Sequence, residues 1–100
     1  MLLQCEYSNW NTMFYLKNNY DETIDSQVIA VPSEDYALNL AHVIDRFLDE
    51  RDIDKADIHY VGVRISDLRS APCENTAVLE AQLSKNLGIE VKDFTEYSKQ

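Results

Sequence analysis

Residues 36–48 constrain the fold of this chain more than any other segment, because their apolar side chains recur three and four positions apart. That spacing places the apolar side chains on one side of an α-helix, which then needs a core to pack against. We expect this helix to be capped by Ser33, with Glu34 and Asp35 in its first turn, and to run to about Arg51. Its apolar stripe consists of Tyr36, Ala37, Leu40, Ala41, Ile44, Phe47 and Leu48.

The residues before this helix have the patterns of β-strands. Residues 2–7 alternate apolar and polar side chains, as a half-buried strand does, and the turn-forming residues 8–12 favour a hairpin with the apolar run that follows. A helix capped by Ser8 is the alternative for this segment. We expect residues 17–26 to form an irregular, mobile loop, with an excursion of the hairpin itself as the alternative. Residues 28–31 then predict a buried strand, which Pro32 ends.

The second half of the sequence predicts a strand, a helix and a last strand. Residues 58–65 are apolar on both faces toward their middle, which is typical of a central strand. Asn75 or Thr76 can cap a second helix, and Gly88 can end it in the left-handed conformation. The alternation over residues 89–94 predicts a short final strand.

Together these patterns predict a single α+β domain over residues 1–100, with residues 95–100 as a frayed tail. The expected order is β-β-β-α-β-α-β. We expect a mixed sheet of about four to five strands with two helices packed on one face and at least one parallel strand pair.

Negative charge is concentrated in residues 34–57, which hold eight acids and three bases and so carry −5 of the chain's net −9. A field of this sign repels nucleic acid and anionic membranes and attracts basic protein surfaces. We therefore expect no direct contact with nucleic acid or membrane. The candidate partner-binding acids on the helix and after it are Asp45, Asp49, Glu50, Asp52, Asp54 and Asp57.

Aromatic residues are a second, weaker candidate for partner contacts. The chain has six tyrosines and one tryptophan, more than two thin core layers require, and both residue types are good interface anchors. The predicted turn and loop hold or adjoin Trp10, Tyr15 and Tyr20.

No pattern in the sequence indicates a reaction or a cofactor. Cys5, Cys73, His42 and His59 include no pair at metal-ligand spacing, and no nucleophile turn or glycine-rich phosphate loop is present in the sequence. We expect both cysteines to be reduced and buried, and we expect neither catalytic residues nor a metal site. Since no basic leader or long apolar stretch opens the sequence, we expect a cytoplasmic protein.

Charge and size thus favour a small inhibitor that binds and occludes a basic, nucleic-acid-handling protein and is not itself an enzyme. A toxin immunity protein and a phage anti-defence inhibitor of the anti-CRISPR type are the settings that fit. Partial DNA mimicry is a sharper version of this hypothesis, but it needs acids in two rows, and the helix supplies one. The alternative is a homo-oligomeric structural subunit, such as a homodimer that pairs through a sheet edge or through Trp10.

Overall fold

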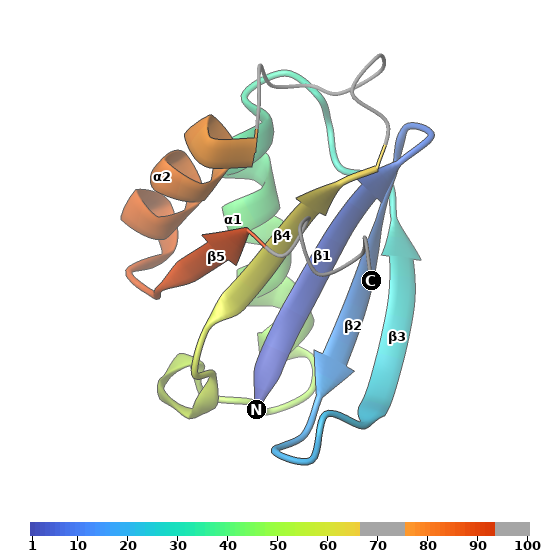
Figure 1. Cartoon of the computed structure of the whole chain (residues 1–100), viewed down its shortest axis with the longest axis vertical. Coiled ribbons are helices and arrows are strands. Elements are labelled where there is room, and N and C mark those ends of the chain that lie inside the picture. The colour runs from blue at the N-terminus through green and yellow to red at the C-terminus, as the bar shows by residue number, and fades with distance from the viewer. Residues whose placement is uncertain (67–75, 94–100) are drawn as a thin grey trace.

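The computed structural model describes residues 1–66 and 76–93, which form one five-stranded mixed sheet with two helices on one face (Figure 1). The predicted order β-β-β-α-β-α-β is confirmed. The predicted tail of residues 95–100, the cap at Asn75 and the side chain of Cys73 lie outside the described residues. The elements are β1 Leu2–Ser8, β2 Asn11–Lys17, β3 Thr23–Ile29, α1 Tyr36–Asp49, the 3₁₀ helix η1 Lys55–Asp57, β4 Val61–Ile65, α2 Thr76–Leu87 and β5 Val91–Asp93.

The strands lie in the order β3-β2-β1-β4-β5. β2 pairs antiparallel with both β1 and β3, whereas β4 runs parallel to both β1 and β5, so the expectation of a parallel pair is confirmed. β1 therefore occupies the middle of the sheet, and β4 is an interior strand beside it. The predicted central strand is thus correctly placed inside the sheet but is shorter than residues 58–65.

The hairpin of β1 and β2 is confirmed, and the alternative helix over this segment is wrong. Ser8 pairs with Asn11, so the turn consists of Asn9 and Trp10, which have φ values of 50° and 71°. Two consecutive residues with positive φ are typical of a type I′ turn, whose twist matches that of the two strands it joins. Asn9 suits this conformation, while a bulky residue such as Trp10 adopts it rarely.

The expectation of a loop over residues 17–26 and a buried strand over residues 28–31 was wrong. β3 begins at Thr23 and pairs with β2 at the edge of the sheet, so most of the expected loop belongs to a strand. The connection is short because the Asn18 side-chain oxygen accepts hydrogen bonds from the backbone N–H groups of Tyr20 (2.8 Å) and Glu22 (3.0 Å). An edge strand lacks a neighbour on one side, and most of β3 is exposed for that reason.

The core lies between the sheet and the helices. Every residue of the predicted stripe on α1 is buried, which confirms the phase of this helix. Phe47 of α1 meets Phe14 of β2 with their ring centroids 5.3 Å apart. The sheet and α2 contribute the buried side chains Leu3, Cys5, Tyr7, Leu16, Val61, Val63, Ile65, Leu79, Leu83, Leu87 and Val91.

The start of α1 differs from the prediction. The helix begins at Tyr36 with no acid in its first turn, so Ser33 does not cap it and Glu34 and Asp35 precede it. Asp35 occupies the cap position with φ 50° and makes no side-chain capping bond. Tyr36 is buried with its hydroxyl 2.6 Å from the Thr12 hydroxyl, and burial of an aromatic ring outweighs a cap of about 1 kcal/mol.

The end of α2 agrees with the prediction. The helix ends at Leu87, and Gly88 follows with φ 72° and donates its N–H to the Ser84 carbonyl oxygen at 2.9 Å. A glycine at this position relieves the steric cost of the left-handed conformation.

Candidate functional site

The six predicted partner-binding acids are all exposed. They follow one another over the last turn of α1, the turn after it and η1. We call this set the acidic surface: Asp45, Asp49, Glu50, Asp52, Asp54 and Asp57.

The local backbone explains why this segment folds back on the helix. The N–H of Asp52, which has φ 54°, donates to the Asp49 carbonyl oxygen at 3.1 Å. The N–H of Ile53 then donates to the Leu48 carbonyl oxygen at 2.9 Å. A residue with positive φ commonly ends a helix in this way, and Asp tolerates that conformation better than most side chains. Ile53 is thereby returned to the core, where it packs partly buried.

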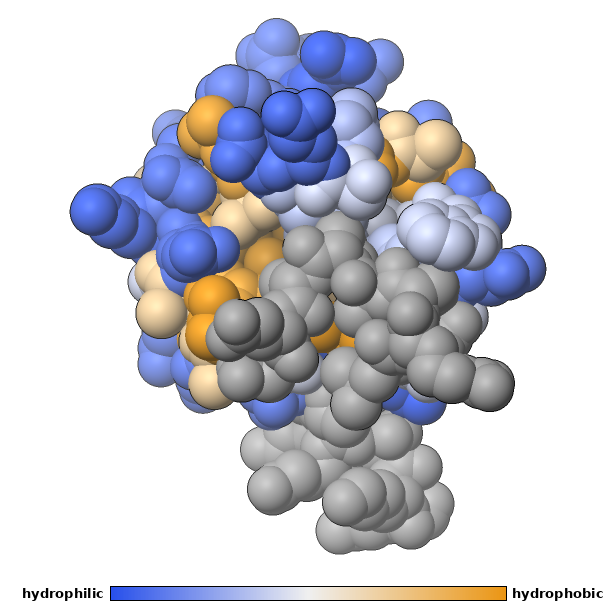
Figure 2. Space-filling model, turned by 90° about the horizontal axis from the view of Figure 1, so that it is seen from above, coloured by the Kyte–Doolittle hydropathy of each residue, from blue (hydrophilic) through white to orange (hydrophobic). Residues whose placement is uncertain are grey.

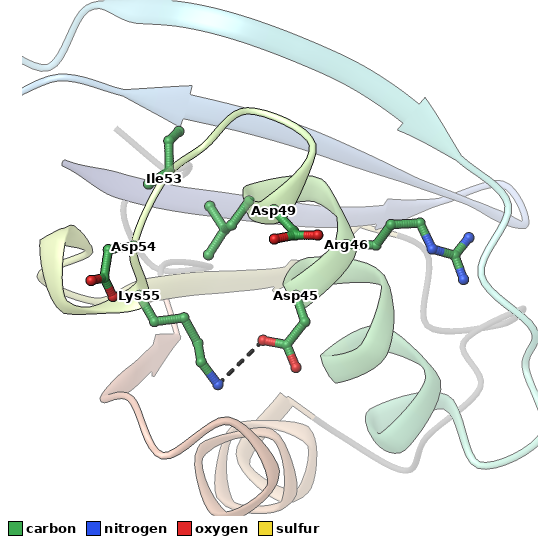
Figure 3. A pocket seen from close by; sticks show the side chains of 7 residues that line it. Asp45, Arg46, Asp49, Ile53, Asp54 and Lys55 are labelled. Carbon is green, nitrogen blue, oxygen red and sulfur yellow. Dashed lines mark ion pairs between the residues drawn. The ribbon is translucent and has the colours of Figure 1, made fainter.

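An open hollow of about 510 Å³ lies within the acidic surface (Figure 3). It has apolar side chains at Leu48, which is buried, and at Ile53, which is half-buried. The remaining lining residues are charged: Asp45, Arg46, Asp49, Asp54 and Lys55. An apolar area surrounded by carboxylates suits a long cationic side chain, which has an aliphatic stem and a charged end.

Lys55 neutralises one carboxylate of the acidic surface. Its Nζ lies 3.2 Å from Asp45 Oδ1 and donates to the Leu87 carbonyl oxygen at 3.3 Å, so it also joins the end of α2 to this region. Arg46 extends away from this ion pair (Figure 3) and makes no ion pair among the residues that the structure describes.

The Arg51 side chain binds the edge strand β3 and none of the acids of the acidic surface among the described residues. Its Nε lies 2.5 Å from Asp25 Oδ2, and its Nη2 donates to Gln27 Oε1 at 3.0 Å. Its Nη1 donates to the Phe47 carbonyl oxygen at 3.0 Å, and its guanidinium lies 3.6 Å from the centre of the Phe47 ring. The hydrogen bond from Arg51 lowers the pKa of the Asp25 carboxyl below its ordinary 3.8.

The acidic surface is consequently less neutralised than the sequence alone indicates. Within residues 1–66 and 76–93, five of its six carboxylates make no ion pair. Asp54 has a structural role, because its side chain accepts the Ala56 N–H at 3.1 Å and caps η1. Asp49, Glu50, Asp52 and Asp57 have no such side-chain bond among the described residues.

The aromatic candidates are separated in space. Trp10, which is 65% exposed, lies in the β1–β2 turn, and Tyr20, which is 84% exposed, lies in the β2–β3 turn. β2 runs the full distance between these turns, about 20 Å for seven residues. Tyr15 is half-buried on β2, and its hydroxyl donates to the Met13 sulfur at 3.4 Å.

Tyr20 lies at the same end as the acidic surface, whereas Trp10 lies at the other. The amino group of Met1 connects the β2–β3 turn to η1, since it donates to the Asn19 side-chain oxygen (3.2 Å) and to the Asp57 carbonyl oxygen (3.1 Å). Figure 2 faces the opposite end of the molecule, where hydrophilic and apolar residues are intermingled. Of Trp10 and Tyr20, Tyr20 is therefore the one at the same end of the molecule as the acids (Figure 1).

The described residues contain no group of three or more His, Cys, Asp or Glu side chains arranged to hold a metal ion. Cys5 is a free, buried thiol, and burial raises its pKa far above the ordinary value. A thiol of this kind stays protonated and is a poor nucleophile. Among residues 1–66 and 76–93, the helices are too short and too polar to cross a membrane.

No protein-family model matches the sequence, and no curated protein matches it either.

Two features of the structure were missed by the sequence reasoning. One is the contact of Arg51 with Asp25 and Gln27, which joins residues about 25 positions apart along the chain. The other is the exposed edge of β3, where Ile24 and Val28 face solvent. Residues 24–28 do not alternate apolar and polar side chains, so no periodic signal in the sequence indicated that strand.

Proposed function

We propose that this protein binds a basic surface of another protein through the acidic surface and inhibits that partner by covering it. The observation that carries the proposal is the imbalance of charge: five of six exposed carboxylates make no ion pair within the described residues, while the nearby Arg51 is bound to Asp25. Asp45 and Asp49 are like charges four positions apart on α1, a spacing that lowers the stability of a helix by a few tenths of a kcal/mol, and Lys55 pairs with Asp45 alone. A basic partner replaces that repulsion with attraction.

The hollow supports a specific form of contact. A lysine or arginine side chain of the partner would lay its aliphatic stem against Ile53 and bring its cation to Asp49 and Asp54. Asp45 is already paired with Lys55, so it contributes less to the partner than these two carboxylates. Tyr20, which is exposed in the β2–β3 turn, would contribute at the margin of the same contact.

The biological settings that suit such a protein are immunity to a nuclease-type toxin and inhibition by a phage of a nucleic-acid-handling defence complex. Each requires a small acidic protein that occludes a nucleic-acid-binding surface in the cytoplasm and needs no active site of its own. The acids lie on a helix end, a turn and a 3₁₀ helix. This arrangement favours a compact contact with a cluster of basic side chains over an extended imitation of a DNA strand.

Charge reversal with a matched control tests the proposal. We would immobilise the wild-type protein, the double variant Asp49→Lys/Glu50→Lys and the control Glu34→Lys/Glu90→Lys, capture proteins from the native cell and identify them by mass spectrometry. Both variants change the net charge equally at exposed positions, but Glu34 and Glu90 lie outside the acidic surface. The partner should bind the wild type and the control and be lost from the Asp49→Lys/Glu50→Lys variant.

Equal capture by both variants would show that total charge or another surface is responsible. We expect each variant to fold, because surface substitutions usually change stability by less than about 0.5 kcal/mol. Circular dichroism checks this expectation. A captured partner whose own basic residues can be substituted without loss of binding would also contradict the proposal.

A further inference from the structure

We infer that the free edge of β3 pairs with the β3 edge of a second copy of this chain, in an antiparallel register centred on Ser26. This inference is independent of the proposed function, because it concerns a different surface. β3 is the terminal strand of the sheet, and no described element lies beyond it (Figure 1). Its outward N–H and C=O groups can therefore pair with another strand, although the Ser26 N–H donates to Asp25 Oδ1 at 2.8 Å and would exchange that bond for one to the second copy.

The edge lacks most of the features that usually prevent such pairing. Edge strands are commonly protected by lysine, proline, a bulge or very short length. β3 spans seven residues without lysine or proline. Its one register irregularity leaves Ile24 without a Cα partner on β2, between the pairs Lys17–Thr23 and Leu16–Asp25, and the pairing of residues 25–29 is regular. At the other edge of the sheet, β5 has three residues, one of them Lys92, and is a poor template by comparison.

The side chains of β3 leave an apolar surface uncovered. Ile24 is 53% exposed and Val28 is 56% exposed. The single charge of the strand, Asp25, is paired with Arg51. The edge is therefore close to neutral within a protein of net charge −9.

A second copy fits this edge better than an arbitrary strand does, because the sequence is complementary to itself about Ser26. In that register Ile24 lies opposite Val28 of the other copy, and the two-fold axis creates this apolar pair twice. Asp25 lies opposite Gln27 and not opposite a second Asp25. Arg51 holds the Gln27 amide oxygen, which leaves the Gln27 amide NH₂ as a donor toward the facing Asp25 carboxylate.

Neighbouring registers are less favourable. A centre at Asp25 places two carboxylates directly opposite each other, and like charges in that position destabilise a strand pair. A centre at Gln27 places Val28 opposite Ser26 and Ile24 opposite Ala30, which lies beyond the end of β3. Self-pairing about Ser26 is thus the arrangement in which both the apolar pair and the charged residue find suitable neighbours.

Cysteine crosslinking of the full chain tests the register directly. Directly opposed residues of an antiparallel pair have Cα atoms about 4.5–5.5 Å apart, within the range of a disulfide. In a Cys73→Ser background, Ser26→Cys should therefore form a covalent dimer under mild oxidation. Thr23→Cys is the control, because its two copies would be about 20 Å apart in this register. Cys5 is buried and does not compete.

Sedimentation at physiological salt, over about a hundredfold range of concentration, measures the noncovalent dimer. We expect Val28→Lys, and separately Ile24→Lys, to raise the dimer dissociation constant by about tenfold or more. Leu38→Lys, at an exposed leucine on α1, should leave it unchanged. A wild-type protein that stays monomeric throughout, a dimer insensitive to both lysine variants, or equal crosslinking of Thr23→Cys and Ser26→Cys would each overturn the inference.

Discussion

Replacement of Phe47 by alanine should lower the free energy of unfolding by about 3–5 kcal/mol. The Phe47 ring is buried on α1, contacts the Phe14 ring and lies beneath the Arg51 guanidinium. Burial of a phenylalanine side chain stabilises a fold by about 1.5–3 kcal/mol. An aromatic pair contributes about 0.5–1.5 kcal/mol more, and a cation–π contact at a partly exposed site about 0.5–1 kcal/mol.

The assay is equilibrium unfolding in urea together with a thermal melt. For a domain of this size, a loss of 3–5 kcal/mol corresponds to a decrease in Tm of about 12–40 °C. Phe47→Leu keeps an apolar side chain and should cost less than about 2 kcal/mol. Leu38→Ala is the control on the same helix, because Leu38 is exposed, and its effect should stay within about 0.5 kcal/mol.

The position of Arg51 on the ring adds a local consequence. Loss of the ring removes one of the contacts by which Arg51 holds Asp25 and Gln27, so amide hydrogens of β3 should exchange faster in Phe47→Ala than global unfolding explains. A melting curve for Phe47→Ala close to that of the wild type, or a Leu38→Ala variant equally destabilised, would refute the assigned face of α1 and with it the position of the acidic surface.

Three further predictions concern charge and the backbone. Because the pKa of Asp25 is lowered in the folded protein, its contribution to stability is present above about pH 3.8 and is lost as pH falls through the lower folded pKa. The free energies of unfolding of wild type and Asp25→Asn, measured in urea, should therefore differ at neutral pH and converge in strong acid. A difference that stays constant with pH would contradict the ion pair. Gly88→Ala should destabilise the fold by about 1–2 kcal/mol, since φ is +72° and no neighbour lies within 4 Å of an added Cβ; an unchanged melt would show that the end of α2 relaxes. The association rate with a captured basic partner should fall steeply as salt shortens the Debye length from about 30 to 8 Å, while a flat rate in stopped-flow measurements would show that the acids do not lead the encounter.

The parts of this fold that the sequence predicted correctly depend on short-range periodicity. The stripe of α1 repeats within each helical turn, the β1–β2 hairpin alternates around a cluster of turn formers, and Gly88 marks the end of α2 by its own conformational freedom. The exposure of the six acids followed from the same helical phase and from the polar turn after it. Such features are decided by neighbours along the chain, so the sequence alone determines them.

The remaining features were decided by contacts between distant residues. The polar residues that begin β3 form a strand because β2 offers them a ladder of hydrogen bonds, and Ser33 does not cap α1 because Tyr36 packs against Thr12. Arg51 is near the acids in sequence but binds Asp25 on the sheet edge. Only the tertiary structure decided which base neutralises which acid and which strand edge remains open, because ion pairs and strand pairs depend on distance in space, which chain order does not specify.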